Sequence, residues 1–190
     1  MQKKFYIVLT VLLTMLLAVS TVHAGGVSIK LSTSLGSLVG NVTATGLGST
    51  DYIFEIEAKG DASVVCTNYG GNQAPGQNYP HTEGKSSKGL QPSEISRNGK
   101  AVFTMETFPD LELNPNISWQ EGGCPNSNWS AKVNFVYYKT VIVTAYVNSG
   151  GGMRGAMVAQ NIYSCVTTRT GPNSTPSTFD DGTVSCTRIG

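Results

Sequence analysis

The sequence predicts an all-β fold: an antiparallel β-sandwich of immunoglobulin-like type with about 7 to 9 strands, following a cleaved signal peptide. Three observations predict it, namely an N-terminal export segment, four cysteines, and short β-branched runs bounded by glycine, asparagine or aspartate. Two sheets that each bury one face accommodate such strands economically. A β-barrel is the structural alternative.

Residues 1–24 have the three-part layout of a secretory signal peptide. Lys3 and Lys4 precede an uncharged apolar stretch, and the small side chains of Val22 and Ala24 suit a signal peptidase. The alternative is an uncleaved membrane anchor, because the stretch approaches the roughly 20 residues that span a bilayer. Polar residues interrupt the stretch, which favours cleavage.

Residues 25–190 form a single predicted domain of balanced charge. Without the two lysines of the signal, the 13 basic residues of the chain become 11, against 12 acidic ones. This balance provides no basic stripe for nucleic acid and no polybasic patch for a membrane after signal cleavage. The expected location is secreted or extracellular, with attachment to a cell surface as a variant.

All four cysteines lie in this domain: Cys66, Cys124, Cys165 and Cys186. An even count in an exported chain favours two disulfides, for which three pairings are open. We prefer the pairing of neighbours along the chain, because the second bridge would then clip the two strands that flank residues 167–181. Zinc is the rival explanation, but the sequence has no CxxC pair, so we expect no metal and no cofactor.

Hydrophobic alternation, together with short β-branched runs, locates the strands. It is cleanest in the second half of the chain, where Val133, Phe135 and Tyr137 occupy one predicted face. A tight change of direction, or a corner between two sheets, is expected near Tyr138 and Lys139. The predicted strands are residues 26–31, 37–45, 51–58, 62–67, 100–107, 131–137, 140–147, 156–166 and 183–189.

Two segments do not follow this alternation. Residues 69–98 contain few apolar side chains and are long for a connection inside one domain. They form either a functional loop, a loop carrying a short edge strand near residues 79–82, or a mobile segment. Residues 148–155 are rich in glycine and predict a flexible hairpin tip.

Two strings of residues are distinctive, GGNQAPGQN at residues 70–78 and CPNSNW at residues 124–129. The first suits a rigid, polar turn, because glycine permits positive φ and side-chain amides bond to backbone groups. Together the strings resemble those of small secreted proteins of bacterial origin that carry no assigned function. The resemblance implies an extracellular sandwich with paired cysteines, and it supplies no catalytic residue.

Aromatic and amide side chains near these strings are the candidate ligand-binding residues. Trp129 either covers one end of the core or lies against a disulfide, and the alternative is an exposed ring that stacks on a sugar. The candidates are Tyr69, Asn72, Gln73, Tyr79, Trp119 and Trp129.

A catalytic group is not predicted. His81 is the only histidine of the domain, no Gly-x-Ser-x-Gly motif accompanies it, and paired cysteines leave no thiol nucleophile. Glu55 and Glu57 would share one strand face about 7 Å apart, which permits glycosidic acid/base chemistry, although a solvated face explains them better. The adjacent acids at residues 180–181 suit an ordinary turn better than calcium.

The sequence therefore predicts a noncatalytic secreted or cell-surface domain with a binding or structural role. Its partner would be an extracellular protein or a glycan, and not a nucleic acid. A carbohydrate-binding module is the sharper alternative. An extracellular hydrolase that uses the Glu55 and Glu57 pair or His81 is the less favoured one.

Overall fold

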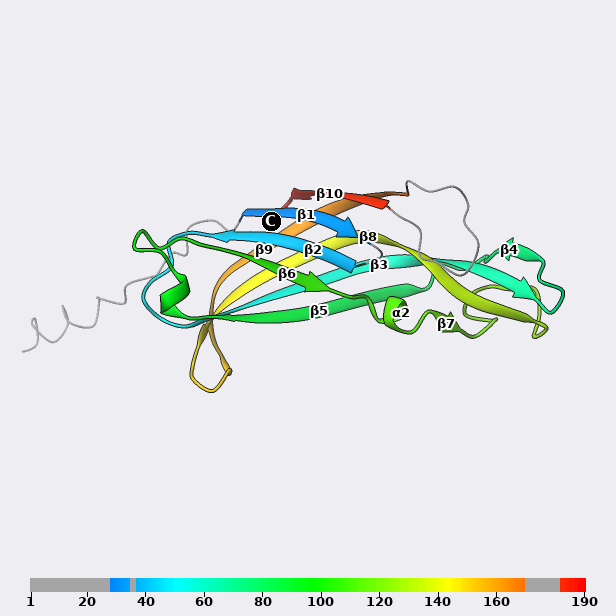
Figure 1. The fold of residues 1–190 in the computed structure, drawn as a ribbon, viewed down its shortest axis with the longest axis horizontal. Coiled ribbons are helices and arrows are strands. Elements are labelled where there is room, and N and C mark those ends of the chain that lie inside the picture. The colour runs from blue at the N-terminus through cyan, green and yellow to red at the C-terminus, as the bar shows by residue number, and fades with distance from the viewer. Residues whose placement is uncertain (1–27, 35–36, 170–181) are drawn as a thin grey trace, which may run out of the picture.

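The computed structural model describes residues 28–34, 37–169 and 182–190, and their fold is all-β. The strands form two antiparallel sheets, and the helical segments of these residues are η1 (Pro92–Glu94) and α2 (Asp110–Leu113) (Figure 1). The prediction of an all-β fold is confirmed. The predicted signal peptide, residues 1–24, lies outside the described residues.

The smaller sheet has three strands in the order β1-β2-β6. Strand β2 is central, since it pairs with β1 on one side and with β6 on the other, both antiparallel. The strands are β1 (Ser28–Ser34), β2 (Ser37–Ala44) and β6 (Ala101–Thr107).

The larger sheet has seven strands, and its centre is the long antiparallel ribbon of β3 and β8. Strands β9 and β10 extend it beyond β8, and β5 lies along the outer side of β3. The short strands β4 and β7 pair with β3 and β8 near one end of the ribbon. The seven are β3 (Tyr52–Asn68), β4 (Gln73–Pro75), β5 (His81–Leu90), β7 (Asn116–Ile117), β8 (Trp129–Asn148), β9 (Arg154–Arg169) and β10 (Gly182–Arg188).

Strands β3 and β8 each replace two shorter predicted strands. The predicted change of direction near Tyr138 and Lys139 is wrong, because β8 continues through this point. Lys59 of β3 faces Thr140 of β8. The next pair joins Gly60 to Tyr138, which leaves Lys139 outside the ladder as a β-bulge. Gly60 is required there, since a Cβ would collide with the backbone of β8.

A second register shift, at Asn134, changes which side chains of β8 share a face. Val133 is buried in the core, whereas Tyr137 is half-buried on the opposite face, beside the β3 residue Asp61. The prediction that Val133, Phe135 and Tyr137 share one face is therefore wrong. A one-residue bulge moves every later side chain to the other face, and alternation in the sequence does not record it.

Strand β5 lies in the segment that the sequence predicted as a loop with a short edge strand. The strand is present but is longer than residues 79–82, and it pairs with β3 from Tyr52 to Asp61. Its side chains are mostly exposed or half-buried. Because an edge strand buries little apolar area, its sequence lacks the hydrophobic alternation of a central strand.

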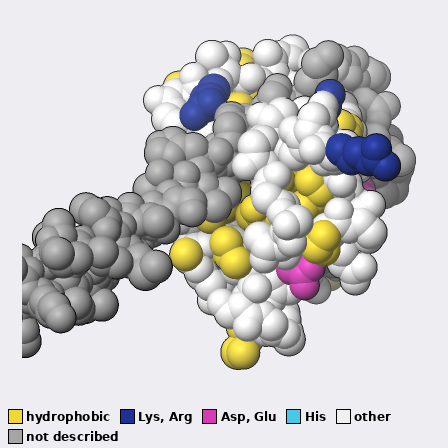
Figure 2. Space-filling model, turned by 90° about the vertical axis from the view of Figure 1, so that its left-hand side faces the viewer, with side chains coloured by type: hydrophobic (Ala, Val, Ile, Leu, Met, Phe, Trp, Pro, Cys, Tyr) yellow, Lys and Arg dark blue, Asp and Glu magenta, His cyan; other side chains and the backbone are white. Residues whose placement is uncertain are grey.

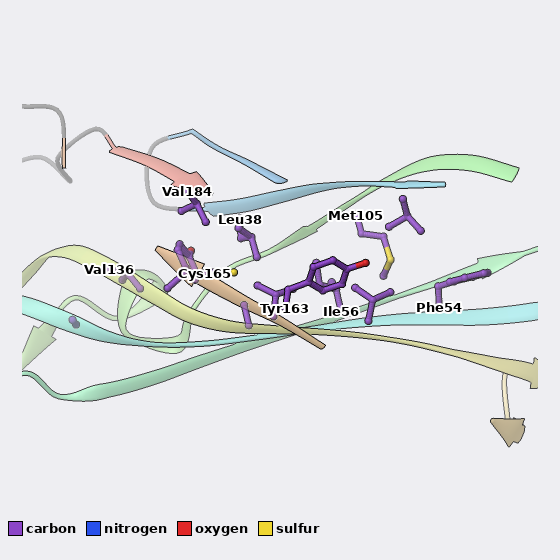
Figure 3. Packing of buried hydrophobic residues seen from close by; sticks show 14 of the residues in the cluster. Leu38, Phe54, Ile56, Met105, Val136, Tyr163, Cys165 and Val184 are labelled. Atoms are coloured by element: carbon purple, nitrogen blue, oxygen red, sulfur yellow. The ribbon is translucent and has the colours of Figure 1, made fainter. Parts of the chain in front are cut away.

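The core lies between the two sheets, where their apolar side chains form one buried cluster. Figure 3 shows Leu38 and Met105 of the smaller sheet pointing toward Ile56 and Tyr163 of the larger one. Phe54 is fully buried, and its ring packs edge-on against Phe103 with 4.9 Å between ring centroids. Contacts across the gap between sheets thus join β3 to β6.

Two disulfides join the cysteines in the preferred pairing, Cys66 with Cys124 and Cys165 with Cys186. The first connects the end of β3 to the loop before β8. The second bridges directly opposed residues of β9 and β10. The predicted pairing is confirmed, and bonds of this kind form and persist in oxidising compartments.

The two sheets also meet at their edges. Strand β1 contacts β10, and strand β5 contacts β6. The end of the molecule opposite β4 and β7 shows few charged side chains, with hydrophobic groups visible between uncharged polar ones (Figure 2). The candidate ligand-binding residues lie at the other end, around the Cys66–Cys124 disulfide.

Candidate functional site

The structure gathers the six candidate residues at one end of the β3–β8 ribbon, but with different exposures. Tyr69 is 90% exposed and Tyr79 is 63% exposed. Trp119 and Trp129 are half-buried and pack against the core cluster. The tyrosines are thus more open to a ligand than the tryptophans.

The turn after β3 is organised by Asn68, a residue that sequence analysis did not single out. Its Oδ1 accepts hydrogen bonds from the backbone amides of Gly70 and Asn72, at 3.0 and 2.9 Å. Its own backbone amide donates to the carbonyl of Asn72 at 3.0 Å. Asn72 therefore closes the predicted polar turn through its backbone.

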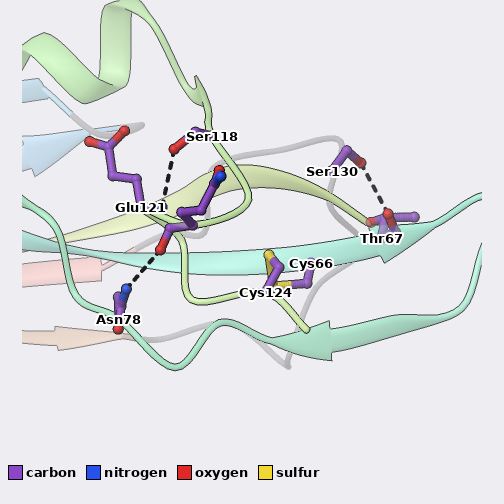
Figure 4. The surroundings of a disulfide bond; sticks show 8 residues. Cys66, Thr67, Asn78, Ser118, Glu121, Cys124 and Ser130 are labelled. Carbon is purple, nitrogen blue, oxygen red and sulfur yellow. Dashed lines mark hydrogen bonds between the residues drawn. A yellow bond between two sulfur atoms is a disulfide. The ribbon is translucent and has the colours of Figure 1, made fainter. Parts of the chain in front are cut away.

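The segment between β4 and β5 is held against the loop that carries Cys124. The backbone amide of Gln77 donates to the carbonyl of Gly123 at 3.2 Å, and Asn78 Nδ2 donates to the carbonyl of Gln120 at 3.0 Å. Figure 4 shows the Asn78 bond beside the disulfide. These bonds fix the backbone directly before Tyr79, which lies in the same segment.

A hollow of about 420 Å³ opens next to Tyr79, on the face of the larger sheet that points away from the core. We call this face the outer face; on β3 it carries the odd-numbered residues from Glu55 to Val65. The hollow joins the candidates Gln73 and Tyr79 to residues from other strands. The lining residues with polar groups that were not among the six candidates are Ser63, Asn134, Tyr137 and Arg169.

Hydrogen bonds and ring contacts hold the floor of this hollow. Ser63 Oγ donates to Oδ1 of the buried Asn134 at 2.8 Å. The Arg169 guanidinium lies 5.8 Å from the centroid of the Phe135 ring. That ring meets Tyr137 edge-on, with 4.8 Å between centroids. The hollow thus combines aromatic, amide, hydroxyl and guanidinium groups whose positions are set by neighbours.

A second hollow, of about 280 Å³, lies on the same outer face and contains Glu55 and Glu57. Their predicted placement on one strand face is confirmed. Both carboxylates form ion pairs, Glu55 with Arg154 and Glu57 with Lys59 and Lys85, the latter two at 2.8 and 3.4 Å.

The hydrogen bond from Lys59 lowers the pKa of the Glu57 carboxyl below its ordinary value. A general acid in glycoside hydrolysis needs the opposite shift, because it must hold a proton near neutral pH. The other residue considered for catalysis, His81, is exposed and lies with Nδ1 3.5 Å from a carboxylate oxygen of Asp61.

Asp61 provides a pH-dependent contribution to stability. The hydrogen bond from Lys139 lowers the pKa of its carboxyl below the ordinary value of 3.8. A lowered folded-state pKa stabilises the fold fully above the ordinary value, and the stabilisation is lost as pH falls through the folded-state value. We expect Asp61→Asn to reduce the unfolding free energy at pH 7 by less than about 1 kcal/mol, since the pair is partly exposed.

Urea denaturation at several pH values would measure this effect. The difference in unfolding free energy between Asp61→Asn and the wild type should disappear in acid well below pH 3.8, where the wild-type carboxyl is also protonated. Glu121→Gln is the control, because Glu121 is exposed and belongs to none of the ion pairs described. It should change the stability little, both at pH 7 and in acid. An Asp61→Asn loss that persists unchanged in acid would contradict the ion-pair explanation.

Within residues 28–34, 37–169 and 182–190 no group of three or more histidine, cysteine, aspartate or glutamate side chains could hold a metal ion. Asp180 and Asp181, the calcium candidates, lie outside this part of the chain. Among the described helices, none has the length and apolar character needed to cross a bilayer.

Known proteins give no relative of this chain. The chain matches no protein-family model, no curated protein and no solved structure.

Proposed function

We propose that this chain works outside the cytoplasm, after removal of residues 1–24, as a noncatalytic binding domain. In this proposal the two sheets are the layers of an immunoglobulin-like sandwich, and the ligand is a glycan held in the hollow beside Tyr79. The export segment and the paired cysteines support the location. The residues that line the hollow are the main observation in favour of a glycan as the ligand.

Sugars expose apolar C–H faces and a ring of hydroxyl groups. The hollow offers the rings of Tyr79 and Tyr137 for the apolar faces, and the exposed amide of Gln73 for hydroxyl groups. A few placed polar groups among apolar surfaces are typical of ligand sites. Tyr79 at the hollow is 63% exposed, so its ring is open to a sugar from the solvent.

The noncatalytic part of the proposal rests on the charged groups of the outer face. Both glutamates of the second hollow are engaged by cations, and the pKa of Glu57 is lowered rather than raised. A hydrolysis assay with pooled polysaccharide, peptide and ester substrates would test it. Turnover that is lost in Glu57→Gln would overturn the noncatalytic assignment.

Removal of the exposed ring tests the binding site. We expect Tyr79→Ala to weaken glycan binding about tenfold, because loss of a central aromatic contact costs more than about 1 kcal/mol. Titration calorimetry with hits from an oligosaccharide panel would measure the affinity.

Tyr69→Ala is the matched control. Tyr69 belongs to the same end of the molecule and is more exposed, but it does not line the hollow. Its removal should leave the affinity unchanged. Equal losses of affinity in the two variants would contradict the placement of the glycan in this hollow. If no sugar of the panel binds, an extracellular protein partner or a structural role is favoured instead.

A further inference from the structure

The two hollows of the outer face lie in line along the same two strands. The first contains Ser63 and Val65 of β3, and the second contains Glu55 and Glu57. Both hollows also take residues from β8. Eight residues of extended strand separate Glu55 from Ser63, which at about 3.3 Å per residue is roughly 26 Å.

The second hollow combines the same kinds of side chain as the first, an amide bonded to a hydroxyl group and an arginine. In the first, the Asn134 amide accepts a bond from the Ser63 hydroxyl, and in the second the Gln160 amide donates to the Thr144 hydroxyl at 3.2 Å. Each hollow also includes a guanidinium that lies over an aromatic ring; in the first the ring is the buried Phe135, and in the second the ring is Tyr146, which itself lines the hollow. Arg154 lies 5.7 Å from the ring centroid of Tyr146, much as the first hollow's arginine lies over a phenylalanine.

Matched chemistry at two aligned positions suits a ligand that presents the same groups repeatedly. A linear polysaccharide does this, since each sugar offers a ring face and several hydroxyl groups. A single small sugar would not extend from one hollow to the other.

The charges of the outer face favour an uncharged polymer. Glu55, Glu57 and Asp61 each form an ion pair with a cation on the face. A polyanion would meet these carboxylates along its path, and a polycation would meet Lys59, Lys139 and Arg154. A hydroxyl-rich chain instead bonds to ion pairs as both donor and acceptor.

We propose that the two hollows are subsites for one linear, uncharged polysaccharide that lies along β3 and β8. The inference rests on the proposed glycan-binding function and adds the size and charge class of the ligand. The second hollow contributes Tyr146 and Gln160 as the groups that contact the polymer.

The test is a series of oligosaccharides of increasing length, cut from an uncharged polysaccharide that binds and titrated by calorimetry. Affinity should rise with length until the oligomer covers both hollows, by at least about tenfold in total. Tyr146→Ala should remove most of this gain and leave the affinity for the shortest binding oligomer within about twofold. Gln160→Ala, a change at an exposed position, should reduce the gain without affecting folding.

Gln120→Ala is the control, because this glutamine is exposed and its side chain lines neither hollow. It should preserve both the affinity and its dependence on length. Short oligomers that bind as tightly as long ones, or a length dependence that survives both second-hollow variants, would overturn the second subsite alone. Binding restricted to acidic polymers would overturn the charge class, whereas no binding by any glycan would overturn the proposed function itself.

Discussion

Phe54→Ala is expected to reduce the free energy of unfolding by about 3–5 kcal/mol. Phe54 is fully buried in β3, and its ring contacts Phe103 of the opposite sheet. Alanine would leave a cavity between the sheets at a point where rigid strands prevent collapse. Urea denaturation followed by tryptophan fluorescence measures the change.

Phe108→Ala provides the comparison, because the same substitution at this position removes a ring that is 42% exposed. It should cost clearly less than Phe54→Ala, since less apolar area is lost from the protein interior. A loss below about 1 kcal/mol for Phe54→Ala would contradict the packing of the two sheets through this residue.

Removal of the Cys66–Cys124 disulfide, by alanine at both positions, should destabilise the protein by about 4 kcal/mol. The bond closes a loop with a sequence separation of 58, and loop closure of that size accounts for this amount on the chain-entropy model. Glycan binding should also weaken in the protein that remains folded. The reason is that the disulfide anchors the loop to which Gln77 and Asn78 bond.

Alanine at both Cys165 and Cys186 is the matched control. That disulfide spans a separation of 21, so its removal should cost about 3 kcal/mol. It joins β9 to β10 and lines neither hollow, so affinity per folded molecule should stay the same. Equal losses of affinity in both double variants would mean that the first disulfide does not position the site.

The strand content and the disulfide pairing could be predicted from sequence because both depend on local patterns. Alternation and β-branched runs located parts of every long strand except β5, although β3 and β8 were each divided in two, and cysteine spacing favoured the pairing that brackets a loop. The two bulges of β8 could not be predicted in the same way. Lys139 and Asn134 become bulges only through their register against β3, which is a partner distant in the sequence.

The candidate site was predicted in part. Gln73 and Tyr79 were selected for their side-chain chemistry, and both line the first hollow. Asn134, Tyr137 and Arg169 were missed, because nothing in their local sequence separates them from ordinary strand residues. The bulge at Asn134 decides that Tyr137 faces outward, and Arg169 approaches Phe135 from β9, a strand distant from it in the sequence.

We expect the edge contacts of β1 with β10 and of β5 with β6 to limit unwanted assembly of this protein. A bare sheet edge is a template on which strands of other molecules add and aggregate. Here the edges of one sheet lie against those of the other, which leaves less room for a strand of a second molecule to add. The lysines at positions 85 and 88 place positive charge along β5 and further discourage such addition.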